Sequence, residues 1–341
     1  MTTRAARRPF VTALVALALV GTTAACAPQP TTRLLTGTAG QSSSAQESVE
    51  ESAPRAATGG AASGAVTAAE NCSDGQPAVA SMNPEGGPQV TAGSTMAAIQ
   101  KRGLLEVGVS ADTLLMGSRN PFTGDIEGFD IDVARQIAAA ILGDPDKIRF
   151  RVITSGDRET LLADHEVDIV TRAFTINCER WENIAFSAEY YHAGQKLLVP
   201  ATSKVSGIKD LAGQRVCAPE GTTTLERLAE WEGVEAVPAA THTTCLVLFQ
   251  QGAVDAITGD DTVLAGFAAQ DPYARVVGDA VSDEPYGVGI PADQPDMVRF
   301  VNGVLEDMIA SGQWAQSYDR WLGDALGAAP QPPEPVYGRT P

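Results

Sequence analysis

Apolar and polar residues alternate regularly from about residue 95 onward. The apolar run 104–109 (LLEVGV) predicts a buried strand. Residues 129–142 predict a helix, because apolar side chains recur every four positions and therefore fall on one face. These positions are Phe129, Val133, Ile137 and Ile141.

Further apolar runs extend this pattern towards the end of the chain. They predict strands at 147–152, 167–170, 196–199, 215–217 and 254–258, and a last strong helix near 296–311. Strands that alternate with helices indicate an α/β fold with mostly parallel sheets.

Two of the predicted strands resemble each other. The segment 167–171 (VDIVT) is similar to 254–258 (VDAIT), and polar residues follow each of them. Ligands of open α/β sheets bind beyond the carboxyl ends of strands. The repeat therefore fits two similar lobes that face each other across a cleft, although two short strands can also match by chance.

The first 25 residues differ from the rest and predict a signal peptide. Three arginines precede an apolar run at 10–20, which is too short to span a bilayer, and small residues then lead to Cys26. The last feature resembles a bacterial lipobox and implies that Cys26 is lipidated. The alternative is an ordinary secreted protein in which Cys26 is removed or stays free. Arginines at 7 and 8 leave export by the twin-arginine route open.

Residues 27 to about 70 are rich in Ala, Ser, Thr, Gly, Pro and Gln and lack hydrophobic periodicity. We therefore expect residues 26–94 to form a disordered tether before the globular part. Without its first 25 residues the chain keeps 21 of its 24 Lys+Arg against 42 Asp+Glu, a formal charge of −21. This charge excludes a basic nucleic-acid binder.

Five cysteines are present, and four remain if Cys26 is lipidated. An even number in an exported chain suggests two disulfides, for which three pairings are possible. The spacing argues against a zinc site, because no CxxC occurs and the three histidines are scattered. We expect neither a metal nor a cofactor.

A series of motifs carries a resemblance to a known family. In chain order they are 124–132 (GDIEGFDID), 167–191 (VDIV to FTINCERWENIAFSAEYY), 210–213 (DLAG), 220–223 (EGTT), 252–256 (GAVDA) and 286–288 (YGV). Over about residues 95–325 this series resembles the bacterial family 3 solute-binding proteins, the amino-acid-binding components of ABC transporters. The likeness is strongest to actinobacterial glutamate- or glutamine-binding lipoproteins.

The resemblance implies a two-lobed periplasmic-binding-protein fold, or Venus flytrap. Lobe 1 would comprise 95–190 and 287–325, lobe 2 would comprise 195–281, and 326–341 would form a C-terminal tail. The chain would cross between the lobes near 190–194 and 282–286. Cys217 and Cys245 both fall within lobe 2, so we expect them to pair, which leaves Cys72 for Cys178.

The resemblance also assigns roles in holding an α-amino acid, whose two charges both need partners when buried. The family's carboxylate ligand corresponds to Arg180, because a guanidinium grips a carboxylate with two hydrogen bonds. Further predicted contacts are the Thr175 hydroxyl, the Ala173 backbone, and the backbone N–H groups of Thr222 and Thr223. The alternatives are a surface arginine and a simple helix cap.

For the ammonium group we predict Asp261, and we assign neighbouring Asp260 to capping the next helix. Arg158 lies in a segment similar to that of acidic-amino-acid binders, where this arginine reaches the distal carboxylate. Arg172 is predicted either to add positive charge or to face solvent. Ser110 occupies a position often held by Asp or Arg in relatives, which leaves the preferred side chain open.

Together these features predict a monomeric, extracytoplasmic lipoprotein that binds glutamate, glutamine, aspartate or asparagine and delivers it to an ABC permease. A sensor that signals through a membrane receptor is the alternative. An enzyme is a third possibility, because some dehydratases share this fold. The sequence contains no nucleophile elbow, metal-spaced histidines or phosphate loop, so we expect no catalytic residues.

Overall fold

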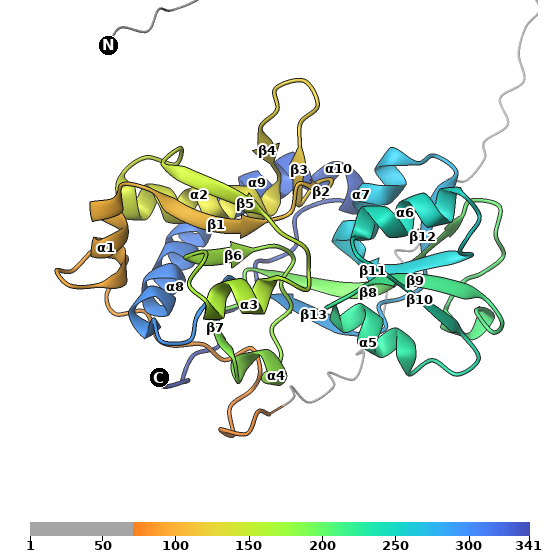
Figure 1. Ribbon diagram of the computed structural model, residues 1–341. Coiled ribbons are helices and arrows are strands. Elements are labelled where there is room, and N and C mark those ends of the chain that lie inside the picture. Colours follow the sequence, from red (N-terminus) through yellow and green to blue (C-terminus); the bar gives the residue numbers. More distant parts are fainter. Residues whose placement is uncertain (1–70) are drawn as a thin grey trace, which may run out of the picture. The chain divides into compact units, whose positions relative to one another are not determined.

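The computed structural model describes residues 71–341, which lie within the compact unit Ser63–Pro341. The predicted signal peptide and Cys26 lie outside the described residues. In this part of the chain no helix is long and apolar enough to cross a membrane. The described residues form two mixed sheets, each flanked by helices (Figure 1).

Lobe 1 is built on a five-stranded sheet of order β5-β1-β6-β14-β7. Its strands are β1 (Leu105–Val109), β5 (Ile148–Val152), β6 (Ile169–Thr171), β7 (Ile184–Phe186) and β14 (Gly289–Pro291). Its helices are α1 (Thr95–Arg102), α2 (Phe129–Leu142), α3 (Arg158–Ala163), α4 (Cys178–Trp181), α8 (Pro295–Ala310), α9 (Gln313–Trp321) and α10 (Gly323–Leu326). A small separate sheet contains β2 (Asp112–Thr113), β3 (Gly117–Arg119) and β4 (Ile126–Glu127).

Lobe 2 is built on a sheet of order β10-β9-β11-β8-β12. Its strands are β8 (Tyr191–Pro200), β9 (Arg215–Pro219), β10 (Glu235–Ala239), β11 (Ala256–Asp260) and β12 (Ala274–Val277). Its helices are α5 (Thr223–Ala229), α6 (His242–Gln250), α7 (Asp261–Gln270) and the 3-10 turn η1 (Ile208–Asp210). Strand β13 (Asp283–Tyr286) pairs with the first half of β8, so the two connections between the lobes run side by side.

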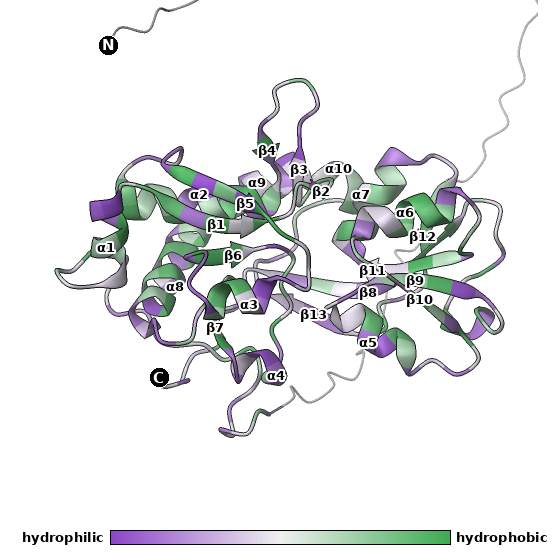
Figure 2. Ribbon diagram, in the orientation of Figure 1, coloured by the Kyte–Doolittle hydropathy of each residue, from purple (hydrophilic) through white to green (hydrophobic). Residues whose placement is uncertain are grey.

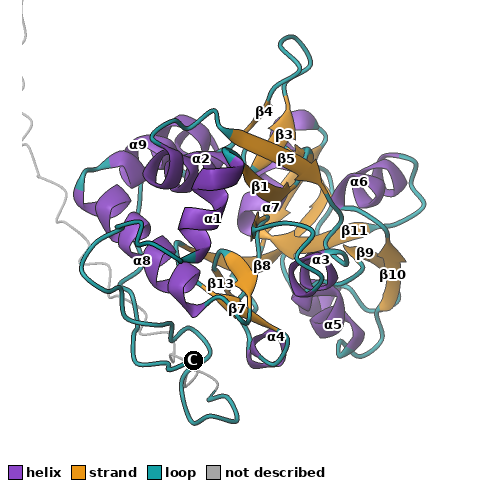
Figure 3. Cartoon of the chain, turned by 60° about the vertical axis from the view of Figure 1, so that its left-hand side comes forward, coloured by secondary structure: helices purple, strands orange, loops and turns teal. Residues whose placement is uncertain are grey.

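The inner strands of both sheets are buried on both faces, which explains the nearly continuous apolar runs in the sequence. Successive side chains on a strand point to opposite faces. In β6, Ile169 faces the core formed with α2 and α8, whereas Val170 faces the core formed with α3. In β8, Leu197 and Leu198 likewise face two different hydrophobic cores. Figure 2 shows the hydrophobic residues along β1 and β6, and Figure 3 shows α1, α2, α8 and α9 gathered beside the lobe 1 sheet.

The two-lobed α/β fold is confirmed, and the predicted helix at 129–142 has the predicted bounds. The sheets are mixed rather than mostly parallel. In lobe 1, β1 runs parallel to β5 and β6, but β14 is antiparallel to both of its neighbours. In lobe 2, β9 is parallel to its neighbours and β8 is antiparallel to all of its own. The antiparallel strands flank the points where the chain passes between lobes.

The prediction of a disordered tether up to residue 94 is wrong for residues 71–94. Ala80 and Ser81 are fully buried, and Ser81 Oγ donates a hydrogen bond of 2.8 Å to the Phe186 carbonyl. Ser81 also bridges to Tyr337 near the end of the chain. The predicted C-terminal tail is therefore docked on the same surface. Side-chain-to-backbone contacts hold these segments, and such contacts leave no hydrophobic period in the sequence.

Arg339 connects the C-terminal segment to residues 74–80. Its guanidinium donates to the carbonyls of Ala80 (2.9 Å) and Pro77 (3.0 Å), forms an ion pair with Asp74, and lies 4.1 Å from the centre of the Trp181 ring. Both predicted disulfides are present, with Cys72 joined to Cys178 and Cys217 joined to Cys245.

Arg339→Ala is expected to lower the free energy of unfolding by about 2–3 kcal/mol, because it removes the donor to the buried Ala80 carbonyl and leaves Asp74 without its ion-pair partner. Arg102→Ala is the control: Arg102 pairs with Asp168 at the surface with 44% of its side chain exposed, and such pairs contribute about 0–1 kcal/mol. Urea titration of both variants measures the difference. Equal small losses would show that the C-terminal contact adds no stability.

Candidate functional site

A small cavity lies where residues of the two lobes meet. Its lining comprises Ser155, Arg158, Ala173 and Thr175 from lobe 1, and Thr222, Thr223, Thr224, His242 and Asp260 from lobe 2. Most of these residues end a strand or follow its carboxyl end, as Ala173 follows β6 and Asp260 ends β11. The expectation from the strand repeat, that polar residues beyond β6 and β11 face a shared cleft, agrees with this placement.

Arg158 begins α3 and is only 3% exposed. Its four hydrogen bonds within the described residues all go to backbone carbonyls, among them Ser155 (2.8 Å), Ala173 (3.1 Å) and Gly221 of lobe 2 (2.7 Å). The guanidinium also lies 4.2 Å from the centre of the Phe174 ring. The structure thus holds a fixed cation at the cavity, and its hydrogen-bond partners are neutral carbonyls.

Arg180 lies behind the lining, next to Thr175. Its Nη1 donates to the Thr175 carbonyl (2.6 Å) and its Nη2 to the Gly221 carbonyl (3.4 Å). Nε lies 3.4 Å from Glu159 Oε1, and the guanidinium stands over the same Phe174 ring as Arg158. Two buried guanidinium groups therefore flank the cavity on the lobe 1 side.

The two adjacent aspartates at the end of β11 line different cavities. Asp260, not Asp261, lines the cavity. Asp260 Oδ2 accepts a hydrogen bond of 2.6 Å from Tyr286 OH, whereas Oδ1 is buried with no partner among the described residues. Burial and the nearby Glu284 carboxylate raise the pKa of Asp260 well above its usual value.

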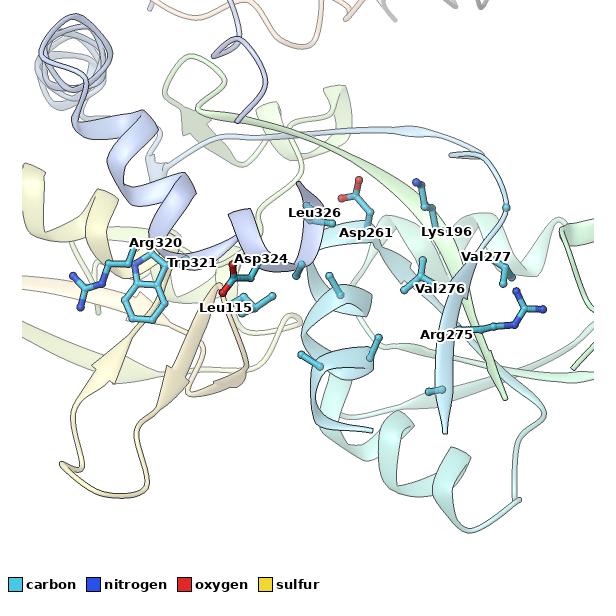
Figure 4. A pocket seen from close by; sticks show the side chains of 16 residues that line it. Leu115, Lys196, Asp261, Arg275, Val276, Val277, Arg320, Trp321, Asp324 and Leu326 are labelled. Atoms are coloured by element: carbon cyan, nitrogen blue, oxygen red, sulfur yellow. The ribbon is translucent and has the colours of Figure 1, made fainter. Parts of the chain in front are cut away.

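Asp261 faces a different part of the molecule. It lines a groove between α7, β12 and α10, and Figure 4 shows it beside Lys196 at the edge of this groove. The reason is local: β11 ends at Asp260 and α7 begins at Asp261, so the change from strand to helix turns the two adjacent side chains to different sides. An ammonium group bound by Asp261 would therefore lie outside the cavity.

The other predicted residues divide between the lining and its surroundings. Ala173, Thr175, Thr222, Thr223 and Arg158 line the cavity. Arg172 is buried behind it, where Nε donates to the Ile153 carbonyl and Nη1 to Ser155 Oγ, so the solvent-facing alternative is wrong. Ser110 is also buried outside the lining and bonds to Asp112 and Thr113.

Sequence reasoning missed Ser155, Thr224 and His242. His242 is buried, and its Nδ1 has no partner within the described part of the chain. Burial, together with the positive charges of Arg172 and Arg158, lowers the pKa of His242 to about 3. The ring is therefore neutral at physiological pH and can either donate or accept one hydrogen bond in the cavity.

This depressed pKa predicts a pH dependence of stability. Between pH 6.5, near the pKa of His in an unfolded chain, and about pH 3 in the fold, the unfolded state binds a proton that the native state does not. Stability is therefore lost as the pH falls through this window, by up to about 1.4 kcal/mol per pH unit. Denaturant titrations from pH 4 to 7 give the free energy of unfolding at each pH. The slope of this free energy against pH should be smaller in His242→Asn than in the parent, by the equivalent of about one bound proton. Identical slopes would mean that His242 titrates normally.

Comparison with known proteins now decides the family. Residues 105–324 match the model of the bacterial extracellular solute-binding proteins, family 3. The chain belongs to this family. The glutamine-binding protein GlnH of Bacillus subtilis, from an ABC transporter, is 34% identical over 67% of this chain and 84% of its own length. The glutamate-binding protein GluB of Corynebacterium efficiens is 32% identical over 69% of this chain and 83% of its own length.

Solved structures agree with this family 3 assignment. A mutant of ArgBP from T. maritima superposes with a TM-score of 0.63 at 27% identity, over 67% of this chain and 99% of its own. An ancestral arginine-binding protein bound to glutamine gives a TM-score of 0.61 at 29% identity, over 65% of this chain and 99% of its own. In this solute-binding protein, the cavity between the lobes is therefore the candidate ligand site.

Proposed function

We propose that this solute-binding protein captures an acidic α-amino acid or its amide between the two lobes and delivers it to an ABC permease. The proposal rests mainly on one observation: a buried guanidinium from lobe 1 and a buried carboxyl group from lobe 2 line the same cavity. Among the described residues, Arg158 from lobe 1 is bonded only to carbonyls, and Asp260 from lobe 2 keeps one buried oxygen without a partner. Buried ionisable groups of both signs that form no ion pair within the described residues suit a ligand that carries both charges.

The α-carboxylate would lie at the side of Arg180, Thr175 and the start of α5. Thr222 caps α5 through a bond from the Leu225 N–H, and the first residues of this helix, Thr223 and Thr224, line the cavity with it. The ammonium would lie at Asp260, where its charge would favour the ionised carboxylate. The Ala173 carbonyl, already an acceptor for Arg158, would be its second partner.

Arg158 then remains for the side chain of the ligand. Ser155 and the neutral His242 lie in the same lining, and Arg172 adds positive charge directly behind Ser155. A distal carboxylate would gain a charge-assisted hydrogen bond there, and an amide oxygen would gain a weaker one. A lysine or arginine side chain would meet like charge in a site closed to water. The names of the glutamine- and glutamate-binding relatives support the same class of ligand.

We further propose that the protein acts as a monomer, with lobes at 95–190 plus 287–325 and at 195–281, and that it carries no catalytic activity. Importer function is favoured over sensing because the Bacillus relative is named as part of an ABC transporter. Calorimetric titration with the twenty amino acids tests the proposal. Micromolar or tighter binding of glutamate, glutamine, aspartate or asparagine is the expected result. Binding of lysine or arginine alone, or turnover of a bound amino acid, would contradict it.

We also propose anchoring by a lipid at Cys26. Cys26→Ser is expected to move nearly all of the protein from the membrane fraction to the medium, because stable attachment then lacks its acyl chains. Cell fractionation followed by immunoblotting measures this distribution. Cys72→Ser is a control, since Cys72 is held in a disulfide with Cys178. Continued membrane attachment of Cys26→Ser would refute the anchor.

A further inference from the structure

The turn after β2 in lobe 1 contacts lobe 2 at a point outside the cavity. The carbonyl oxygen of Leu114 lies so close to Gly266 in α7 that a Cβ atom there would be 2.4 Å from it. Nearby, Thr243 Oγ1 in the first turn of α6 donates a hydrogen bond of 3.2 Å to the Asp112 carbonyl. We call this contact between residues 112–115 of lobe 1 and Thr243 and Gly266 of lobe 2 the latch. Its residues do not line the cavity.

The lobe 1 side of the latch has a strained backbone. Leu115 has a φ of 78°, which is unfavourable for a bulky side chain. The start of α2 holds the turn in place, because the Phe129 and Asp130 amides donate to the carbonyls of Leu115 (2.9 Å) and Met116 (3.0 Å). Strain that a fold retains in this way is often found where a segment has a function.

The lobe 2 side of the latch is a glycine inside a helix. Gly266 lies within α7 (Asp261–Gln270), where glycine is less favourable than alanine because it loses more backbone entropy. The three atoms nearest to a Cβ at this position all belong to Leu114. An alanine would therefore suit α7 by itself better than glycine, and the approach of lobe 1 is what requires glycine here.

A second contact between the lobes lies at the cavity itself. A Cβ at Gly221 would be 2.6 Å from Gly156 Cα, and Arg158 donates to the Gly221 carbonyl. This contact involves residues assigned to the ligand, so its strength cannot be separated from ligand binding. The latch contains no such residue, and it can therefore stabilise the observed contact between the lobes independently of the ligand.

We propose that the latch sets amino-acid affinity by stabilising the closed arrangement of the lobes without touching the ligand. The inference rests on the proposed amino-acid-binding function. A contact that forms only when the lobes close increases the fraction of protein competent to hold the ligand, and apparent affinity rises by the same factor. Leu114 and Gly266 are thus affinity-determining residues outside the binding site.

Gly266→Ala tests the latch. Its Cβ would overlap the Leu114 carbonyl, so we expect L-glutamate to bind at least about tenfold more weakly by calorimetry, with most of the change in the dissociation rate. The melting temperature of the ligand-free variant should equal or exceed that of the parent, because alanine favours the helix. Gly323→Ala is the control: its Cβ would have no heavy atom nearer than 3.9 Å, and its affinity should equal that of the parent.

Thr243→Val removes only the hydrogen bond to Asp112 and should weaken binding by about two- to fivefold. Parent-like affinity of Gly266→Ala would overturn the latch, as would a loss of affinity matched by a lower ligand-free melting temperature. A parent that binds no amino acid would contradict the proposed function instead. X-ray scattering of the ligand-free proteins would then decide the latch: a larger radius of gyration for Gly266→Ala supports it, and equal values overturn it.

Discussion

Asp260→Asn is expected to weaken the binding of every amino-acid ligand by about 100-fold or more, which corresponds to about 3 kcal/mol. The substitution keeps the size of the side chain and its bond to Tyr286 but removes the negative charge that would face the ligand's ammonium. The α-ammonium is common to all candidate ligands, so the loss should be similar for glutamate and glutamine. Titration calorimetry with both ligands measures it.

The unfolding temperature of Asp260→Asn distinguishes the loss of a ligand contact from misfolding. Asp260 is a buried carboxylate with one oxygen unpartnered among the described residues, and such a charge disfavours the ligand-free fold. Asp260→Asn should therefore unfold at the same or a higher temperature than the parent. Asp261→Asn is the matched control, because Asp261 lines the groove beside α10. If Asp261→Asn lost binding and Asp260→Asn retained it, the assignment of the ammonium ligand would be reversed.

Arg158→Ala is expected to weaken glutamate binding by about 100-fold and glutamine binding by only about tenfold. A guanidinium forms a charge-assisted bond with a distal carboxylate but a weaker bond with an amide oxygen. Both ligands should lose some affinity, because Arg158 also donates to the Ala173 and Gly221 carbonyls that shape the cavity. Arg180→Ala, in contrast, should affect glutamate and glutamine equally, since we assign Arg180 to the α-carboxylate.

Arg158→Lys provides a control for the loss of packing over Phe174. It retains the charge but not the planar fork of donors, so glutamate should still be preferred over glutamine although both bind more weakly. The informative quantity is the ratio of the two dissociation constants in each variant. An unchanged ratio in Arg158→Ala would show that Arg158 does not contact the side chain of the ligand.

Periodicity predicted the parts of the fold that depend on burial. The helix at 129–142 was predicted from the apolar residues on one of its faces. The strands around 105, 196 and 256 were predicted from apolar runs, because these inner strands are buried on both faces of their sheets. Strand direction left no such signal, so the antiparallel placement of β8 and β14 was not predicted. The docked segment at 71–94 was missed for a related reason, since polar bonds, the Cys72–Cys178 disulfide and isolated buried residues such as Met82 hold it, and these leave no hydrophobic period.

The residues of the candidate site also divide into those that the sequence predicted and those that it did not. Arg158, Thr175 and Thr222 were found because they follow strand ends in recognisable motifs. Asp260 and Asp261 are adjacent, and a shift of one residue at the end of β11 decides which carboxylate faces the cavity. His242 reaches the cavity from α6 through tertiary packing alone, so no local pattern marked it.

A crystal structure of the protein with L-glutamate tests the central claim most directly. The proposal predicts that the ligand lies between the lobes, with its ammonium within hydrogen-bond distance of Asp260 Oδ1, its α-carboxylate at Arg180 and its distal carboxylate at Arg158. Glutamate bound in the groove beside Asp261, or bound in the cavity with its α-carboxylate at Arg158 and its distal carboxylate at Arg180, would contradict this account.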